Sequence, residues 1–398
     1  MDRTPQIKAI DKIAVLFVLL VSGTTYFFMF FARYSVSLFF LFSIYFFLKK
    51  KGKVDRGNII VLSFILLSFL LNYFFLNTDH WEGNSQIYTY CMLAIASFCI
   101  YSKMPYIHFK WILLRLVFLL ALISIILFIG VETGFFVCSE IRKGNSSNMV
   151  FLFHNFGWFG YLYHRLAGLY WEPGAYQIVL NTTLLLYLKD FCYKLVNRKE
   201  KRMLYIILLA SLLTQSTASY LVLGVLIICY TYINIKVTRS KNIMQVLLLM
   251  IIAICSIYVL LRSEVVTEKL SQKDIENSSY EIRKRDNLGL LVMISQKPFI
   301  GFGLDTKQFI TKSRLLQNST SSNGILYYCA VFGIPFVLVL LIRIYYNIKQ
   351  FNIGLPLVLI FTVFILINSF EVYLYFPLMY IFIYSFLKNR KPLSCLEK

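Results

Sequence analysis

The sequence predicts an all-α polytopic membrane protein with about twelve transmembrane helices. Hydrophobic residues make up 59% of the 398 residues, and the mean hydropathy is +0.69. Apolar runs follow one another along the whole chain, separated by short polar or charged segments. The 40 Lys and Arg residues outnumber the 19 Asp and Glu residues and gather in alternate segments. These observations indicate a single integral membrane domain over residues 1–398.

The predicted spans are apolar runs bounded by charged or polar segments. Several are shorter than the roughly 20 residues that a straight span needs, so we expect some helices to be broken. The spans lie near residues 14–31, 35–48, 59–76, 87–101, 111–131, 176–188, 203–217, 219–235, 243–261, 325–342, 355–370 and 373–387.

The distribution of charge predicts the orientation of the chain. With the N-terminus in the cytoplasm, most Lys and Arg residues fall in inside segments such as 49–58 and 189–202, whereas most acidic residues fall outside. The positive-inside rule then places both termini in the cytoplasm and the large loops 132–175 and 262–324 outside. Because the excess charge is spread over short turns, it suits contact with an anionic leaflet, and nucleic acid is not expected as a partner.

Several classes of site are excluded by what the sequence lacks. It has no serine-hydrolase elbow, no phosphate-binding P-loop, no HExxH zinc motif and no Asp-x-Asp pair for a metal-held phosphate. The histidines His80, His108, His154 and His164 have no ligand spacing, so we expect no metal and no cofactor. Of the eight cysteines only Cys138 is predicted to face outward, which excludes an extracellular disulfide framework.

The outer loop 132–175 changes character along its length. It opens polar, and the stretch 149–171 is then apolar and aromatic, with no charge before Arg165. This pattern predicts a re-entrant or interfacial element with aromatic anchors. Because non-helical backbone at membrane depth must be covered by protein or line a wet cavity, a cavity is one expectation, and a simple interfacial helix is the other.

A polar cluster interrupts two short apolar runs further along the chain. We place it at the outer end of a tight helical hairpin. Its hydroxyl groups can cap the helix ends and satisfy freed backbone groups, or they can face a sugar, and the sequence favours neither. The cluster consists of Thr214, Gln215, Ser216, Thr217 and Ser219.

The outer loop 262–324 predicts a short amphipathic helix over 279–296 that lies along the membrane face. Pro298 ends this helix, and Gly301-Phe302-Gly303 makes a tight turn, which is not a dinucleotide site because no strand or third glycine accompanies it. Polar residues 318–324 then cap the next span. The apolar positions of the predicted helix are Leu288, Leu291 and Val292, followed by Ser295.

Cations and one carboxylate carry the chemistry predicted for the outer loops. Arg165, Arg283, Lys284 and Arg285 can hold a diphosphate, because a planar guanidinium donates two hydrogen bonds to a phosphate while it stays ionised. A fixed cation also stabilises the charge of a diphosphate leaving group without a metal. Glu172 can act as the general base on an attacking hydroxyl. The basic run can instead be a solvated helix face.

Aromatic residues surround the carboxylate in the sequence. The general-base role requires that partial burial by Trp171 and Tyr170 raises the pKa of Glu172 toward neutrality. Together with Tyr176, these residues offer faces on which sugar rings can stack. Arg165 lies seven positions before Glu172, so the two side chains can alternatively form an ion pair with each other.

Short motifs within residues 150–345 resemble those of the O-antigen and capsular polysaccharide polymerase family (Wzy-type), which is related to the O-antigen ligases. The family has an Arg-x-x-Gly-x-x-x-Glu-Pro-Gly element, a Thr-x-Ser hairpin, a Pro-x-x-Gly-x-Gly turn and a polar start to the next span. Here these motifs are matched by Arg165, Gly168, Glu172, Pro173 and Gly174, by Thr214 and Ser216, by Pro298, Gly301 and Gly303, and by Ser321, Ser322 and Asn323.

Two departures from the family pattern stand out. Ser322 occupies the place of the family's frequent histidine, and Thr217 follows the hairpin serine where the family has an arginine. Either Arg283 or Arg285 matches the arginine that precedes the family's amphipathic helix.

The resemblance implies a GT-C-like architecture and a metal-independent glycosyltransferase in a bacterial cytoplasmic (inner) membrane. The substrate would be an oligosaccharide linked to undecaprenyl diphosphate, polymerised at the outer face into O-antigen, capsule or exopolysaccharide. A chain-length regulator protein would be a partner. We assign catalysis to Glu172 and Arg165, and substrate binding to His164, Trp171, Tyr176, Arg283, Arg285, Gly303 and Asn323.

Two other functions are considered beside this one. An O-antigen ligase would use the same lipid carrier, and the serine in place of the family histidine disfavours it. A repeat-unit flippase or transporter is expected to carry charges near the bilayer midplane and to have related halves. Here the polar residues concentrate in two outer loops, which favours an enzyme.

Overall fold

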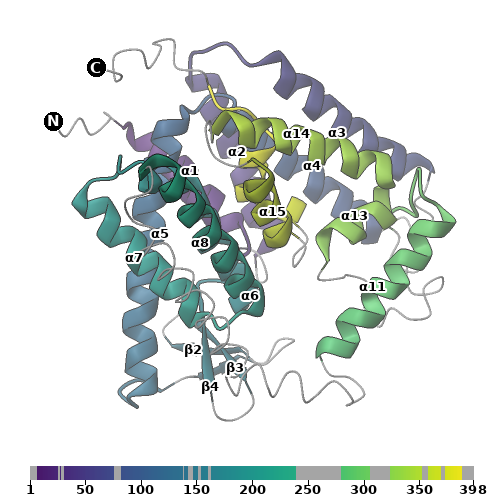
Figure 1. The fold of residues 1–398 in the computed structure, drawn as a ribbon. Coiled ribbons are helices and arrows are strands. Elements are labelled where there is room, and N and C mark those ends of the chain that lie inside the picture. The colour runs from purple at the N-terminus through teal and green to yellow at the C-terminus, as the bar shows by residue number, and fades with distance from the viewer. Residues whose placement is uncertain are drawn as a thin grey trace.

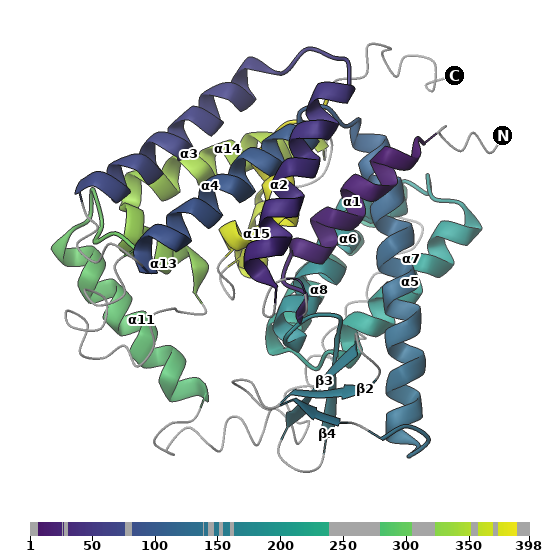
Figure 2. The ribbon, with the colours of Figure 1, turned by 180° about the vertical axis from the view of Figure 1, so that it is seen from behind.

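The chain forms a bundle of helices with one small sheet at its lower end in Figure 1, and Figure 2 shows the same arrangement from behind. Most of the described residues are helical, as the sequence predicts. The predicted span 243–261 lies outside them. The computed structural model describes residues 7–25, 27, 31–75, 82–137, 139–141, 147–150, 154–159, 163–238, 279–304, 323–351, 357–368 and 373–387.

From α2 to α8 the helices follow the predicted apolar runs closely. Three of them are long and apolar enough to cross a membrane within the described part of the chain, namely 32–49, 56–74 and 106–132. The count of about twelve spans and the GT-C-like architecture stay predictions. The helices are α1 (Ala9–Val21), α2 (Ala32–Lys49), α3 (Arg56–Phe75), α4 (Glu82–Tyr101), α5 (Tyr106–Glu132), α6 (Pro173–Cys192), α7 (Arg198–Leu213), α8 (Thr217–Thr238), α11 (Ser279–Gln296), α13 (Gly324–Phe332), α14 (Ile334–Phe351) and α15 (Leu357–Asn368), followed by the 3-10 helices η3 (Tyr373–Tyr375) and η4 (Pro377–Phe382).

Ion pairs join the segments that the charge pattern places in the cytoplasm. Every residue in these pairs comes from a segment predicted to lie inside, so these segments meet at one end of the bundle. Which end faces the cytoplasm stays a prediction. The pairs are Asp11 with Lys50, Lys110 with Asp190, and Arg343 with Asp55, and His108 Nδ1 lies 3.5 Å from Asp11 Oδ2.

The turn after α1 contacts the loop 132–175, which is predicted to lie outside. The first helix ends at Val21, ten residues before the predicted end of the first span. The following turn pairs instead with the outer loop, where Thr25 N donates to Leu169 O (2.9 Å) and Thr24 bridges Tyr170. Hydrophobicity alone cannot reveal this boundary, because residues 22–31 are apolar enough to continue a helix.

A four-stranded antiparallel sheet stands where a re-entrant or interfacial element was expected, so the all-α prediction is incomplete. The stretch is rich in Phe, Tyr and Trp and is interrupted by glycines, which favours strands over a helix. Its position relative to a membrane stays a prediction. The strands are β1 (Ser139–Ile141), β2 (Ser147–Val150), β3 (His154–Phe159) and β4 (Tyr163–Gly168), in the order β1-β2-β3-β4.

The predicted span 325–342 is wrong as a single helix, because the chain breaks at Gly333 between α13 and α14. Gly333 has a φ of 87°, and a Cβ at this position would lie 2.1 Å from Phe299 O. The turn that follows α11, at residues 298–303, packs into this break. Ile334 N donates to Pro298 O (2.7 Å), and Phe302 N donates to Ala330 O (2.8 Å).

The predicted final span 373–387 is also wrong as an α-helix. The segment forms the 3-10 helices η3 and η4 and is buried among other helices. Such backbone survives in an apolar interior because side chains from elsewhere satisfy its polar groups. Tyr101 Oη donates to Pro377 O, Leu378 N donates to Ser22 Oγ, Asn347 Nδ2 donates to Phe382 O and Ile383 O, and Asn58 bonds both Ser385 N and Ser385 O.

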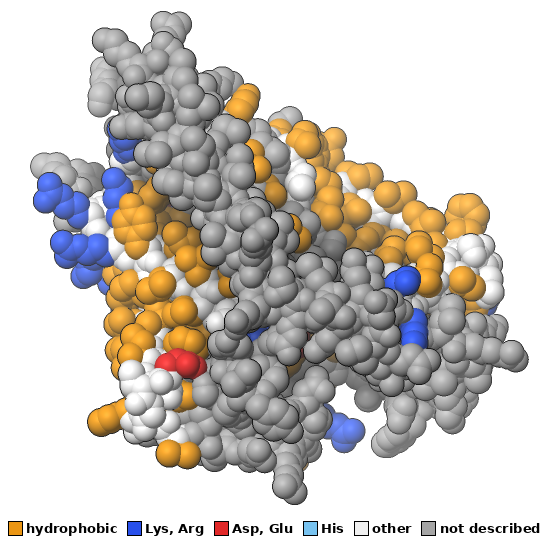
Figure 3. Space-filling view, turned by 60° about the horizontal axis from the view of Figure 1, so that its bottom comes forward, with side chains coloured by type: hydrophobic (Ala, Val, Ile, Leu, Met, Phe, Trp, Pro, Cys, Tyr) orange, Lys and Arg blue, Asp and Glu red, His pale blue; other side chains and the backbone are white. Residues whose placement is uncertain are grey.

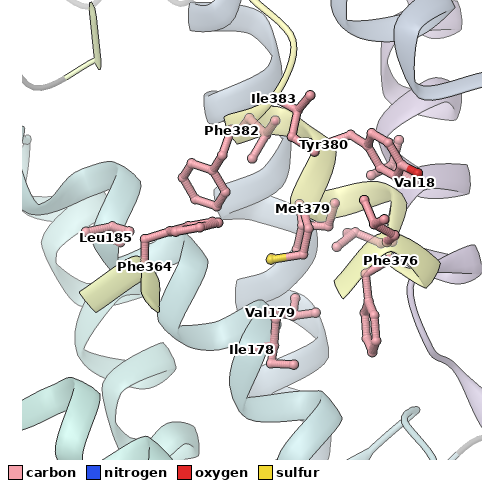
Figure 4. Close-up of a cluster of buried hydrophobic side chains, with 14 of the residues drawn as sticks. Val18, Ile178, Val179, Leu185, Phe364, Phe376, Met379, Tyr380, Phe382 and Ile383 are labelled. Carbon is pink, nitrogen blue, oxygen red and sulfur yellow. The ribbon is translucent and has the colours of Figure 1, made fainter. Parts of the chain in front are cut away.

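The hydrophobic core closes around this C-terminal segment. Figure 4 shows its side chains reaching toward α1, α6 and α15. The packing explains why an apolar stretch of this length need not span a membrane: the other helices already cover it. The labelled residues are Phe376, Met379, Tyr380, Phe382 and Ile383 from the segment, and Val18, Ile178, Val179, Leu185 and Phe364 around it.

The helix predicted at 279–296 is confirmed as α11, with the same bounds. It packs on α13 through a different face from the apolar face expected from the sequence. The buried residues include Asp286, Leu290 and Met293, whereas Leu288, Leu291 and Val292 are about half exposed.

Candidate functional site

Arg165 lies in β4, where it pairs with Gly157 of β3, and its side chain reaches the α7–α8 turn. Its Nε donates to Thr214 O (3.3 Å), and the side chain is half-buried. The contact brings together two motifs that are 49 positions apart in the sequence. A guanidinium stays ionised and can donate two hydrogen bonds to a phosphate, which suits a group that binds a diphosphate.

The α7–α8 turn uses its polar residues to reverse the chain. Thr214 caps the end of α7, and its Oγ1 donates to Ser211 O (2.7 Å). Gln215 adopts a left-handed conformation with a φ of 47°, and Ser216 O accepts from Tyr220 N (3.1 Å) at the start of α8. The buried Thr214 therefore serves as a cap, which was one of the two predicted roles.

A cluster of fully buried polar side chains lies next to this turn, between α6, α7 and α8. Asn181 Nδ2 donates to Gln177 Oε1 (2.7 Å) and to Ser219 Oγ (3.3 Å), and Asn181 Oδ1 accepts from Ser211 Oγ (2.9 Å). Gln177 Nε2 and Thr182 Oγ1 are buried without a hydrogen-bond partner. Polar groups in such a place hold the hairpin on α6 in one register, because sliding it would leave more of them unpaired.

Glu172 occupies the N-cap of α6, directly before Pro173. Its backbone is extended (φ −152°, ψ 159°), and its side chain does not cap the helix. Tyr176 N donates to Glu172 O (3.2 Å), so the first turn fixes the position of this residue. The residue is half-buried, and the positive end of the helix dipole favours a negative charge there.

His154 is a residue of this region that the sequence pattern did not single out. It lies in β3, is only 7% exposed, and its Nδ1 lies 3.4 Å from Ser124 Oγ of α5. Tyr176 Oη donates to the same Ser124 Oγ (3.4 Å). Gly168, with a φ of 59°, lies against Tyr176 and Ser124. A Cβ at this position would approach the Tyr176 ring to 3.0 Å. These contacts fasten the sheet to α5 and α6.

The aromatic residues predicted to stack on sugars are packed mainly against protein. Tyr170 and Tyr176 are fully buried and stack on each other, with ring centroids 5.3 Å apart. Trp171 is half-buried, and its ring lies 5.6 Å from that of Phe376. Of the three, Trp171 therefore has the most surface left for a ligand.

The second group of predicted site residues lies on α11 and at the start of α13. Arg285 is half-buried on α11. Asn323 is the N-cap of α13: its Oδ1 accepts from Leu326 N (3.2 Å), and its Nδ2 donates to Asn287 Oδ1 (3.3 Å) of α11. The predicted polar cap of this helix is thus confirmed. The side chains of Arg283 and His164 lie outside the described part of the structure.

Gly303 belongs to the turn that fills the break between α13 and α14. Its N donates to Val331 O (3.0 Å), and its φ is 84°. Gly301 approaches the same helix so closely that a Cβ would lie 2.3 Å from Val331 O. Asn72 of α3 stabilises the turn, because its Oδ1 accepts from Leu304 N (3.2 Å). Glycine is needed at 301 for this close approach, and both positions have a positive φ, which favours glycine.

The described residues therefore form two separate groups, one on the sheet, α6 and the α7–α8 turn, and one on α11 and α13. Figures 1 and 2 both show α11 away from the sheet, on the other side of the lower half of the molecule. The first group combines a cation, a carboxylate and a rigid polar support, which suits acid–base and anion-stabilising chemistry. No protein-family model, no curated protein and no solved structure matches the chain.

Proposed function

We propose that the protein is a metal-independent membrane glycosyltransferase that polymerises oligosaccharide repeat units linked to undecaprenyl diphosphate. The reaction would take place at the outer face of a bacterial cytoplasmic membrane and would supply O-antigen, capsule or exopolysaccharide. Support comes from the short motifs shared with the polymerase family and from the place of three of them in the structure.

The observation that carries the proposal is the contact of Arg165 with the α7–α8 turn. The Arg-x-x-Gly-x-x-x-Glu-Pro-Gly motif supplies Arg165 and the N-cap Glu172, and the Thr-x-Ser motif supplies the turn that accepts from Arg165 Nε. Two short motifs that fold against each other are better evidence of one site than either motif alone.

In the proposed reaction, a hydroxyl oxygen of the acceptor repeat unit attacks the anomeric carbon of the donor chain. The new carbon–oxygen bond forms as the bond from that carbon to the diphosphate oxygen breaks, and the bonding electrons leave with the diphosphate. Glu172 takes the proton of the attacking hydroxyl, and Arg165 stabilises the charge that develops on the leaving group. A chain-length regulator remains a proposed partner.

The glycans that accumulate on the lipid carrier test the class of reaction. When the gene is removed, single repeat units should remain linked to the carrier or to the acceptor core. Complete polymer left on the carrier would point to a ligase instead. Repeat units trapped on the cytoplasmic side would point to a flippase.

Substitutions at the two central residues test the assignment of roles. Arg165→Lys should lose most polymer, since an ammonium group does not reproduce a two-pronged grip on a phosphate. Glu172→Gln should reduce the rate by about 10²–10⁴. Arg202→Lys and Glu132→Gln, at exposed positions, are the matched controls. Normal chain length in Glu172→Gln at normal protein level would remove Glu172 from catalysis.

The same residues allow a test of the simpler ion-pair explanation. If Arg165 and Glu172 serve only to pair with each other, the exchange Arg165→Glu with Glu172→Arg should restore both protein level and polymer. If they act on substrate, the exchanged protein should accumulate without making polymer. Chain length on a gel and protein level in isolated membranes distinguish the two.

A further inference from the structure

An apolar groove of about 360 Å³ lies between α6, α7 and α8, away from the site described above. Each helix contributes residues spaced by three or four positions, so each presents one continuous stripe to the groove. None of the lining side chains is charged. The lining residues are Leu184, Tyr187, Leu188 and Phe191 of α6, Leu204, Tyr205 and Leu208 of α7, and Leu223, Leu226, Ile227 and Tyr230 of α8.

The groove lies toward the end of the bundle at which α6 ends and α7 begins. The turn between these helices, 193–197, is mostly exposed. The rings of Tyr205 and Tyr230 flank that of Phe191, at centroid distances of 6.0 and 5.6 Å. Aromatic side chains of this kind are typical of the depth at which lipid chains meet their headgroups.

Lys201 lies on the same face of α7 as the residues that line the groove. Lys201 precedes Leu204 and Tyr205 by three and four positions, which places it one turn further along the same face of the helix. Glu200, its acidic neighbour, is engaged in the helix cap, where its carboxylate accepts from Asn197 N (3.1 Å). Lys201 is thus positioned to meet an anion above the apolar stripe.

Further positive charge surrounds this end of α7. Figure 3 shows lysine and arginine side chains gathered at the left edge of the molecule, where α7 begins in Figure 1. Arg198, Lys199 and Arg202 are all exposed there. An apolar groove that ends under a group of cations matches a molecule with a hydrocarbon chain and an anionic headgroup.

We propose that this groove binds an anionic phospholipid of the leaflet at the start of α7, with one acyl chain along the three stripes and the phosphate beside Lys201. The predicted orientation makes this the cytoplasmic leaflet. The lipid would brace the α7–α8 hairpin from the end opposite the Arg165 contact. The proposal does not depend on the polymerase activity.

Binding of defined lipids to the detergent-solubilised full chain tests the proposal. Native mass spectrometry with dioleoyl phosphatidylglycerol should show one tightly bound lipid, and dioleoyl phosphatidylcholine should bind more weakly. Lys201→Ala should weaken phosphatidylglycerol binding by about five-fold, because one lysine near an anionic headgroup contributes about that factor. Lys53→Ala, which removes the same charge from an exposed position on the turn between α2 and α3, away from the groove, is the control.

Filling the groove gives an independent measurement. Leu208→Trp should remove the bound lipid, whereas Leu209→Trp, at the neighbouring position outside the groove, should leave it in place. Should Leu208→Trp fail to accumulate, the Lys201→Ala result decides. Equal binding of the two lipids, equal loss in both tryptophan variants, or displacement of phosphatidylglycerol by a polyprenyl phosphate at lower concentration would each overturn the proposal.

Discussion

Mild acid should weaken the attachment of the sheet to the helices, because His154 is buried against α5. Burial lowers the pKa of His154 to about 4, whereas an unfolded histidine has a pKa of about 6.5. The unfolded chain therefore binds the proton first. The stability that neutral His154 contributes is fully present above pH 6.5 and is lost as the pH falls toward 4.

The size of this effect follows from the difference between the two pKa values. Each pH unit between them lowers the free energy of unfolding by about 1.4 kcal/mol. The loss is roughly 2 kcal/mol at pH 5 and about 3 kcal/mol by pH 4. The range above pH 5 is the more useful one, since carboxylates begin to titrate below it.

Denaturant titration of the protein in detergent micelles, repeated between pH 7 and pH 5, measures this loss. His154→Gln should remove the part of the pH dependence that His154 contributes. Ser124→Ala should retain it, because burial and not the contact with Ser124 lowers the pKa. Ser124 and Tyr176 are the polar groups that face this corner from α5 and α6. The same slope in wild type and His154→Gln would refute the reasoning.

Three further predictions concern the fold. Gly168→Ala should destabilise the protein by about 1–2 kcal/mol, because an alanine is strained at positive φ, and thermal unfolding in detergent measures this. Asn58→Leu should cost about 3 kcal/mol or more and lower the protein level in membranes, since it leaves both the N–H and the C=O of Ser385 without partners. Lys199→Cys should resist an impermeant thiol reagent in intact cells; labelling from outside would overturn the predicted orientation.

The sequence determined the course of most helices by itself. An apolar run bounded by charges has few alternatives to a helix when its backbone must be satisfied without water, so α2 to α8 lie close to the predicted spans. Caps are equally local: Asn197 and Glu200 start α7, and Asn323 starts α13. The bounds of α11 followed from helical spacing and the proline after it.

The sequence also identified parts of the candidate site without showing how they meet. Arg165, Glu172 and the Thr214–Ser216 turn were recognisable as residue types and motifs. Their assembly depends on the register of β3 and β4 and on the packing of the α7–α8 hairpin on α6. His154 carried no signal, because a lone histidine between aromatic residues has no spacing that marks its burial.

Only the tertiary structure decided which apolar segments are covered by protein. Hydropathy measures how unfavourable water is for a segment, and it is the same whether lipid or another helix replaces the water. The segment 373–387 could therefore become buried 3-10 backbone, because Asn58 and Asn347 on distant helices supply its hydrogen bonds. The break at Gly333 likewise exists because the turn at Gly301 fits against it, and that fit is a property of the folded chain alone.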